Sequence, residues 1–134
     1  LSGGISCYRK KVFESVKFDT LNDFFMLEDI DFSTRAADFF GNEYFFISTC
    51  LCLEHNMSPI NRLKLYARWL RKLRENVLFY KKHRLKLFSF INFLWLLIGL
   101  LGESIVMSIL SRSFGPLFGF LSGLIAGIRQ KVVK

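Results

Sequence analysis

The sequence predicts an α/β segment followed by an amphipathic helix and then by membrane-embedded helices. Three observations predict this order. Short apolar runs alternate with turn residues up to Ser58-Pro59, apolar residues then recur every three or four positions among Lys and Arg, and a long uncharged run follows. The hydrophobic content of 51% is therefore unevenly distributed, and we divide the chain into residues 1–59, 60–86 and 87–134.

The first segment predicts strands and helices in alternation. We expect a short strand at residues 5–8 and one or two helical turns at residues 9–16. A helix over residues 32–40 would gather Phe and Ala on one side and would end at Gly41. A second strand is expected at residues 45–53, where the chain is rich in Phe, Ile, Thr and Cys.

The second segment predicts a long basic helix. Residues 61–86 hold ten Lys and Arg against one Glu, whereas residues 1–60 hold five against nine Asp and Glu. A cationic helix with an apolar stripe suits a membrane interface, with Tyr66, Trp69 and Tyr80 at headgroup depth. The alternative is a helix that packs its stripe on protein and leaves its basic face in water. Since each Lys or Arg near an anionic bilayer gains about 1 kcal/mol, we expect membrane lipids as a partner and no nucleic acid.

The third segment predicts membrane association. Residues 87–102 are sixteen uncharged residues, and the apolar run reaches Ser111 if Glu103 is tolerated. A crossing takes about twenty apolar residues, so only the longer run is sufficient. Because Lys and Arg flank both ends of the segment, the positive-inside rule favours a hairpin that turns near Glu103–Pro116, with both flanks in the cytoplasm.

A cluster of carboxylates, Glu28-Asp29-Ile30-Asp31, follows an apolar run and begins a helix. Acidic clusters at the start of a helix are most often N-terminal caps, and negative charge there suits the helix dipole. The same position also suits a general base, because a side chain there is held rigidly beside a cleft. Transfer of a sugar with inversion needs such a base to take the proton of the attacking hydroxyl.

The order of several short motifs resembles the family-2 glycosyltransferases of GT-A fold. The resemblance covers residues 2–62 and continues more weakly through residues 74–83 and 123–129. The motifs that carry it are Gly3-Gly4, Arg9-Lys10-Lys11-Val12-Phe13, Phe18-Asp19, Glu28-Asp29-Ile30-Asp31-Phe32-Ser33-Thr34-Arg35, Gly41 and His55. The fold implied is α/β, with residues 1–59 forming the acceptor-side, carboxy-terminal part of a GT-A catalytic domain.

The resemblance implies a role for each matching residue. Asp29 is the general base and Glu28 supports it. Gly3 and Gly4 bind substrate, since only glycine lets the backbone approach so closely. The remaining matches are Asp31 and Arg35 as substrate-binding residues, although a structural ion pair is the simpler role for Arg35, and His55 as a metal ligand.

One ambiguity concerns Asp29 and Asp31, which also fit the Asp-x-Asp pattern that holds Mg²⁺ or Mn²⁺ on the donor diphosphate. The flanking motifs favour the base. The divalent metal would then be held mainly by an upstream half, which we expect because the chain begins at Leu1 without Met or a leader. A fragment without that half is not expected to be active alone.

The function implied is inverting transfer of a sugar from a nucleotide-sugar donor to a hydroxyl of a saccharide or polyprenyl-linked acceptor. The location implied is the inner, cytoplasmic membrane, with residues 1–59 facing the cytoplasm. The alternative is a small basic module that binds membranes or a partner without catalysis. In that case Glu28-Asp29-Ile30-Asp31 is only the start of a helix.

Overall fold

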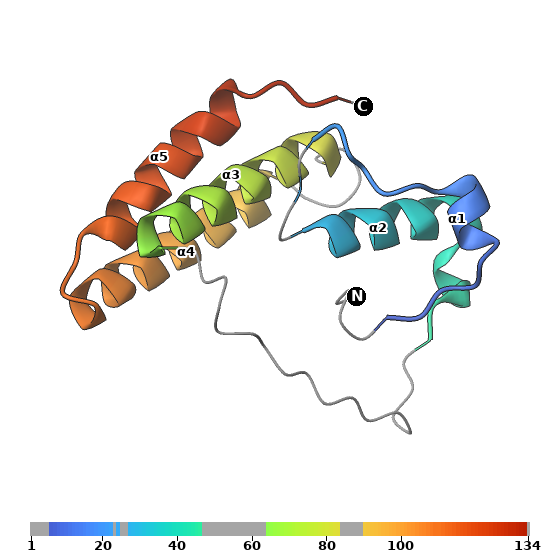
Figure 1. The fold of residues 1–134 in the computed structure, drawn as a ribbon, viewed down its shortest axis with the longest axis horizontal. Coiled ribbons are helices and arrows are strands. Elements are labelled where there is room, and N and C mark those ends of the chain that lie inside the picture. The colour runs from blue at the N-terminus through green and yellow to red at the C-terminus, as the bar shows by residue number, and fades with distance from the viewer. Residues whose placement is uncertain (1–5, 23, 25–26, 47–63, 84–89, 134) are drawn as a thin grey trace. The chain divides into compact units, whose positions relative to one another are not determined.

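The computed structural model describes residues 6–22, 24, 27–46, 64–83 and 90–133. The chain folds as two compact units, residues 1–61 and 62–134. The first unit contains α1 (Val12–Ser15), α2 (Glu28–Phe40) and the 3₁₀ turn η2 (Asn42–Tyr44), and the second contains α3 (Leu65–His83), α4 (Phe90–Leu110) and α5 (Gly115–Arg129) (Figure 1).

The predicted α/β class, and with it the GT-A domain, is wrong for this part of the chain. The described residues are 74% helical and contain no strand. Residues 6–8 of the first predicted strand are irregular, because Tyr8 anchors them to α2 through its side chain instead of through a backbone ladder. The second predicted strand, residues 45–53, falls largely outside the described residues.

Helix α2 begins four residues before its predicted start, so that Glu28, Asp29 and Asp31 all lie in its first turn. Negative charge is favourable there because unpaired N–H groups give the helix start a partial positive charge. The helix ends at Gly41, whose N–H donates to Ala37 O at 2.9 Å. Gly41 has φ +100°, a left-handed conformation that favours glycine.

The core of the first unit is a cluster of aromatic rings around Phe32, which is fully buried. Phe18 stacks on it with ring centroids 4.5 Å apart, Phe13 stacks at 5.3 Å, and Tyr8 meets it edge-on at 5.0 Å. These rings come from the irregular segments before α2 and from α1. The cluster therefore fixes those short segments against the helix.

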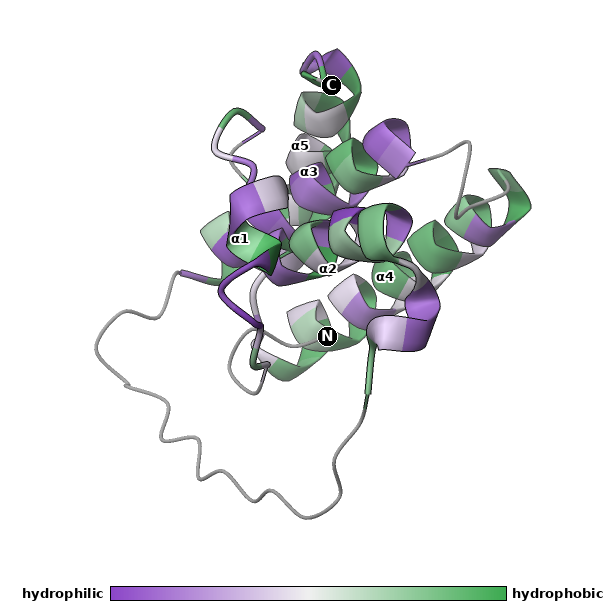
Figure 2. Ribbon diagram, turned by 90° about the vertical axis from the view of Figure 1, so that its right-hand side faces the viewer, coloured by the Kyte–Doolittle hydropathy of each residue, from purple (hydrophilic) through white to green (hydrophobic). Residues whose placement is uncertain are grey.

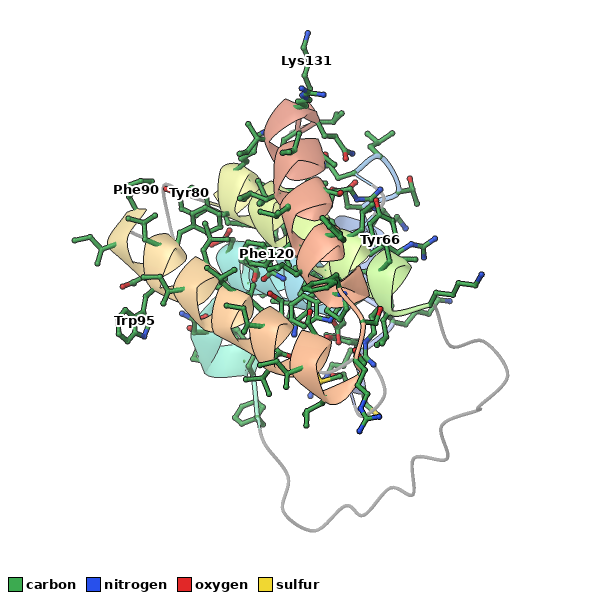
Figure 3. The ribbon with its side chains drawn as sticks, turned by 90° about the vertical axis from the view of Figure 1, so that its left-hand side faces the viewer. Tyr66, Tyr80, Phe90, Trp95, Phe120 and Lys131 are labelled. Atoms are coloured by element: carbon green, nitrogen blue, oxygen red, sulfur yellow. The ribbon has the colours of Figure 1, made fainter. Side chains whose placement is uncertain are left out.

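The described residues of the second unit form three helices, with α3 parallel to α5 and antiparallel to α4 (Figure 1). Its core contains Trp69 and Leu73 of α3, Leu100 of α4 and Phe120 of α5. Figure 3 shows Phe120 between the helices and Trp95 pointing away from them. Trp69 is buried among the helices, so this part of the apolar stripe of α3 packs on protein. That is the alternative given above to a position at headgroup depth.

Glycines bring α3 and α5 unusually close. Gly119, Gly123 and Gly127 occur every fourth residue and form one stripe along α5. A Cβ added to Gly119 would lie 2.8 Å from Trp69 Cβ, and one added to Gly127 would lie 2.7 Å from Val77 Cβ. Small residues at this spacing let helix backbones approach, as in membrane helix pairs.

Two lysines of α3 tie it to its neighbours. Lys72 Nζ lies 2.6 Å from Glu103 Oε2 of α4. Lys81 Nζ donates to the carbonyl oxygens of Gly127 and Ile128, at 3.2 and 3.1 Å, and to that of Gln130. A cation at the end of a helix satisfies carbonyl groups that have no partner within the helix. Lys81 therefore caps α5.

Helix α4 is long and apolar enough to cross a membrane, and α5 is a shorter apolar helix. Green predominates along α4 in Figure 2, whereas α3 alternates between polar and apolar residues. The helix runs unbroken through Glu103. The chain then turns at residues 111–114 before α5, which begins at Gly115 and has Pro116 in its first turn. This turn falls within the interval predicted for the hairpin.

Candidate functional site

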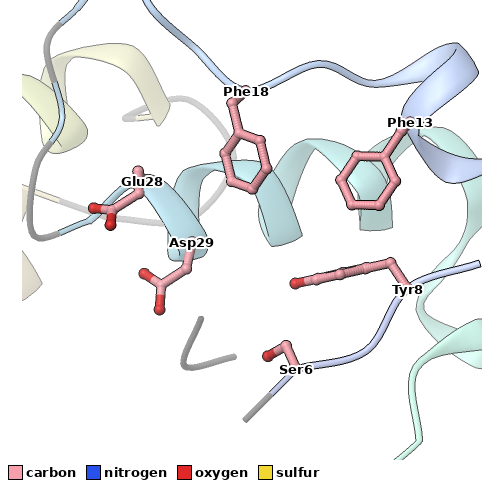
Figure 4. Close-up of a pocket in the computed structure, with 6 residues that line it drawn as sticks. All are labelled: Ser6, Tyr8, Phe13, Phe18, Glu28 and Asp29. Carbon is pink, nitrogen blue, oxygen red and sulfur yellow. The ribbon is translucent and has the colours of Figure 1, made fainter. Parts of the chain in front are cut away.

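A hollow of about 360 Å³ lies in the first unit beside the first turn of α2 (Figure 4). Its lining combines carboxylates, hydroxyls and phenyl rings, contributed by Ser6, Tyr8, Phe13, Phe18, Glu28 and Asp29. Small-molecule sites commonly have about 300–1,000 Å³ and mix an apolar wall with a few polar groups. The hollow is therefore large enough for a small ligand such as a sugar ring.

Asp29 is one of the two carboxylates that line the hollow. Its Oδ1 accepts a hydrogen bond from Ile30 N–H at 2.8 Å, which holds the side chain at the helix start. Its backbone carbonyl accepts from Ser33 Oγ at 2.7 Å. Because the Ser33 hydroxyl proton is used in that bond, Ser33 Oγ accepts from the Tyr8 hydroxyl at 2.9 Å. Asp29, Ser33 and Tyr8 thus form one connected network.

Glu28 contributes the second carboxylate of the hollow. Its Oε2 is buried and has no hydrogen-bond partner among the residues that the structure describes. A buried carboxylate oxygen without a partner is unfavourable. Because Oε2 is buried, the remainder of the Glu28 side chain lines the hollow beside Asp29.

Asp31 and Arg35 lie away from the hollow. The Asp31 side chain is fully buried, and its Oδ2 accepts from Arg35 Nε at 2.9 Å. Two residues apart on a helix, Asp29 and Asp31 point about 200° apart around its axis. The pair is therefore not arranged to clamp one metal ion, and Arg35 has the structural ion-pair role considered above.

The remaining predicted site residues, Gly3, Gly4 and His55, lie outside the described residues, and their roles stay predictions. Within residues 6–22, 24, 27–46, 64–83 and 90–133, no group of three or more His, Cys, Asp or Glu side chains could hold a metal ion. The described side chains do not form a site that fits Mg²⁺ or Mn²⁺.

Sequence reasoning gave no role to the aromatic side of the hollow. Phe13 and Phe18 belong to motifs that carried the family resemblance, and Tyr8 belongs to the segment predicted as a strand. The only sequence pattern that marks them is their spacing: Tyr8, Phe13 and Phe18 are five residues apart and precede the acidic cluster. That signal is weak, because most aromatic residues in such a pattern are core residues.

No family model, curated protein or solved structure matches the chain. The likeness to family-2 glycosyltransferases consequently depends on the order of motifs in residues 2–62. The evidence for function within the chain itself is the pairing of Asp29 and Glu28 with an aromatic wall.

Proposed function

We propose that this chain is the acceptor-side part of a membrane-attached, inverting glycosyltransferase in which Asp29 is the general base. The observation that carries the proposal is the hollow in which the carboxylates of Glu28 and Asp29 meet the rings of Phe13 and Phe18. Only the activity is taken from the resemblance to family-2 glycosyltransferases. The α/β GT-A fold is not, because the described residues are helical.

Asp29 performs the proton transfer of the reaction. A hydroxyl of the acceptor attacks the anomeric carbon of the donor sugar, its proton passes to an Asp29 carboxylate oxygen, and the nucleoside diphosphate leaves from the opposite face. Configuration at the anomeric carbon is inverted because one displacement occurs. The Ile30 N–H bond supports this role, since a base must be oriented toward the proton that it takes.

Glu28 and the rings bind the acceptor. A hydroxyl of the acceptor donates to the carboxylate of Glu28, which lines the hollow beside Asp29. Phe18 offers a flat apolar surface against which a sugar ring can lie, and it is held in place by stacking on Phe32 at 4.5 Å. Binding that fixes the attacking oxygen near Asp29 contributes to rate through orientation.

The donor is a nucleotide sugar, and another part of the natural protein would bind its nucleotide. The divalent metal expected from the family would lie there too, since Asp31 is engaged with Arg35 and Asp29 points elsewhere. No step proposed for Asp29 or Glu28 depends on that ion. The acceptor is a saccharide, with a polyprenyl-linked one favoured because α4 is apolar enough for a membrane.

The location proposed is the inner membrane, with the first unit on its cytoplasmic face. A second candidate function is a membrane-binding module without catalysis, favoured by one observation, the exposed apolar side chains of α4. On that account Glu28 and Asp29 only begin a helix, and their replacement leaves every function of the protein unchanged.

Transfer by an Asp29→Asn variant tests the proposal. The protein, at its full natural length and in native membranes, is supplied with radiolabelled UDP-, GDP- and dTDP-hexoses, and label in lipid and polysaccharide fractions is counted. Loss of a general base predicts a decrease of about 10²- to 10⁴-fold. Asp38→Asn, an exposed carboxylate on the same helix outside the hollow, is the matched control. Equal transfer by both variants would reject the proposal in favour of the module.

A further inference from the structure

The second unit exposes a broad apolar surface on α4 and α5. Only a narrow seam of α4, including Phe93, Leu100 and Ser104, is buried. Large apolar side chains stand exposed around the rest of α4 and along α5: Phe90, Ile91, Leu94, Trp95, Ile98, Ile105, Ile109, Leu110, Phe118, Leu121, Ile125 and Ile128. An apolar surface of this extent marks an interaction site.

The neighbouring helix α3 restricts how that surface can meet a bilayer. Tyr80 stacks on Phe93 with ring centroids 4.0 Å apart, and Lys72 reaches Glu103. These contacts place the two helices next to each other, in opposite directions, between Lys72 and Tyr80 of α3 and between Phe93 and Glu103 of α4 (Figure 1). Any depth that α4 reaches in a bilayer is therefore shared by the facing part of α3.

A crossing by α4 would carry charge into the hydrocarbon. Leu100, in the middle of α4, belongs to the same buried cluster as Leu73 of α3. Around Leu73, α3 carries Arg71, Lys72 and Arg74. Each Arg or Lys at the centre of a membrane helix is strongly unfavourable, because the charge loses its hydration. Lys72 is paired with Glu103 and Arg74 lies 3.8 Å from Glu75, yet three cations against two carboxylates leave a net positive charge here, which opposes a crossing.

Helix lengths oppose a hairpin in which both α4 and α5 cross the membrane. Helix α4 has 21 residues and α5 has 15, which gives about 31 and 22 Å at 1.5 Å per residue. The hydrocarbon core is about 30 Å thick. If α4 crossed it, Arg112 would emerge on the far side, and α5 would be about 8 Å too short to return Arg129 to the first side.

We infer that α4 and α5 lie in the plane of the membrane, embedded in one leaflet of an anionic bilayer without crossing it. Their exposed apolar faces enter the acyl region, and α3 lies on the headgroup side. The exposed cations Arg112, Arg129 and Lys131 then all lie at one membrane surface, where anionic headgroups attract them. Because these cations border the exposed apolar surface of α4 and α5, we assign anionic lipid as the partner that covers this surface.

The ion pair between Lys72 and Glu103 suits this placement. Glu103 is half exposed although it belongs to the most apolar helix of the chain. In a crossing helix that exposure would turn a carboxylate toward acyl chains. In the plane of the membrane, the pair lies beside α3 at headgroup depth, where water and counterions solvate it.

Depth-dependent quenching of single tryptophans tests the inference. The chain has two tryptophans, so Trp69→Phe combined with Trp95→Phe gives a background for Ile91→Trp, Ile98→Trp and Ile109→Trp, which share one exposed face of α4. The protein is bound to vesicles of equal parts phosphatidylglycerol and phosphatidylethanolamine that carry bromine at defined acyl positions. Helices in the plane give three similar depths. A crossing gives a residue 98 deeper than residue 91 by about 10 Å, and this result would overturn the inference.

Labelling of the turn provides a second measurement that does not need tryptophan variants. Cys7, Cys50 and Cys52 are replaced by Ser, and Lys82→Cys and Ser113→Cys, which flank α4, are treated with a membrane-impermeant maleimide in sealed vesicles of each orientation. The inference predicts that both sites react from the same side. Reaction from opposite sides, or a soluble dimer whose tryptophans escape lipid quenching, would contradict it. The result bears on residues 64–133 alone, so its failure leaves the sugar-transfer proposal intact.

Discussion

Lys72 Nζ of α3 lies 2.6 Å from Glu103 Oε2 of α4, and the same ammonium group lies 4.7 Å from the centre of the Trp69 ring. One lysine thus joins the basic helix to the acidic residue of an otherwise uncharged apolar helix. The contact explains how α4 accommodates a carboxylate. It also fixes the register between two helices that are separated in sequence by residues 84–89.

A double-mutant cycle of Lys72→Met and Glu103→Gln measures that contact. Because both side chains are partly exposed, we expect a coupling of about 0.2–1 kcal/mol in the free energy of unfolding, decreasing with added salt. Chemical denaturation in mild detergent gives the four unfolding free energies. Additive effects of the two substitutions would show that the pair contributes nothing to the packing of α3 on α4.

The glycine stripe of α5 predicts a position-specific cost. Gly123→Ala places a Cβ 2.8 Å from Leu73 Cβ and against the Leu70 carbonyl, so we expect a loss of about 1–3 kcal/mol in unfolding free energy. Gly99→Ala on α4 is the control, since its Cβ meets nothing within 4 Å and gains helix propensity of about 1 kcal/mol. Thermal unfolding compares the two. A Gly123→Ala variant as stable as the control would refute the close approach of α3 and α5.

Lys81 predicts a local effect at the end of α5. Lys81→Met removes the donor to the carbonyls of Gly127, Ile128 and Gln130, which we expect to cost about 1 kcal/mol. Amide hydrogen exchange should accelerate in the last turn of α5, while exchange in α4 stays unchanged. Lys82→Met, the neighbouring cation, is the control and should leave exchange in α5 unaltered.

The aromatic cluster separates stability from ligand binding. Phe32→Ala removes the fully buried ring and should lower unfolding free energy by about 3–5 kcal/mol. Phe18→Ala removes a half-exposed ring at the hollow and should cost about 1 kcal/mol of stability while weakening acceptor use. Denaturation and the acceptor concentration dependence of transfer distinguish them. Normal acceptor use by a folded Phe18→Ala variant would exclude Phe18 from the binding site.

Periodicity in the sequence was a good guide to the long helices. The alternation of apolar and basic residues predicted α3, because a helix with one buried face repeats apolar residues every three or four positions. The uncharged run predicted α4, because a helix in an apolar environment can be apolar on all sides. The turn before α5 was signalled by Gly115 and Pro116. The spacing of Gly119, Gly123 and Gly127 also predicts close helix packing, yet it identifies the partner helix only once the fold is known.

Short apolar runs were a poor guide in the first unit. Residues 6–8 alternate as a strand does, but Tyr8 directs its ring onto Phe32 and its hydroxyl to Ser33. Such contacts between distant residues override local propensity. Of the predicted site residues, Asp29 and Glu28 line a hollow, and their catalytic roles stay predictions. The sequence of the acidic motif could not show that Asp31 is buried and paired with Arg35, because that depends on how the helix packs.

Binding and transfer measured together on Asp29→Asn test the central claim most directly. Binding of Mn²⁺ and of the nucleotide sugar used for transfer is followed by calorimetry on the protein at its full natural length, alongside the transfer rate. If Asp29 is the base, transfer falls by about 10²- to 10⁴-fold while the affinities for Mn²⁺ and the nucleotide sugar are unchanged. Loss of Mn²⁺ binding together with transfer, or transfer at the original rate, would contradict the assignment.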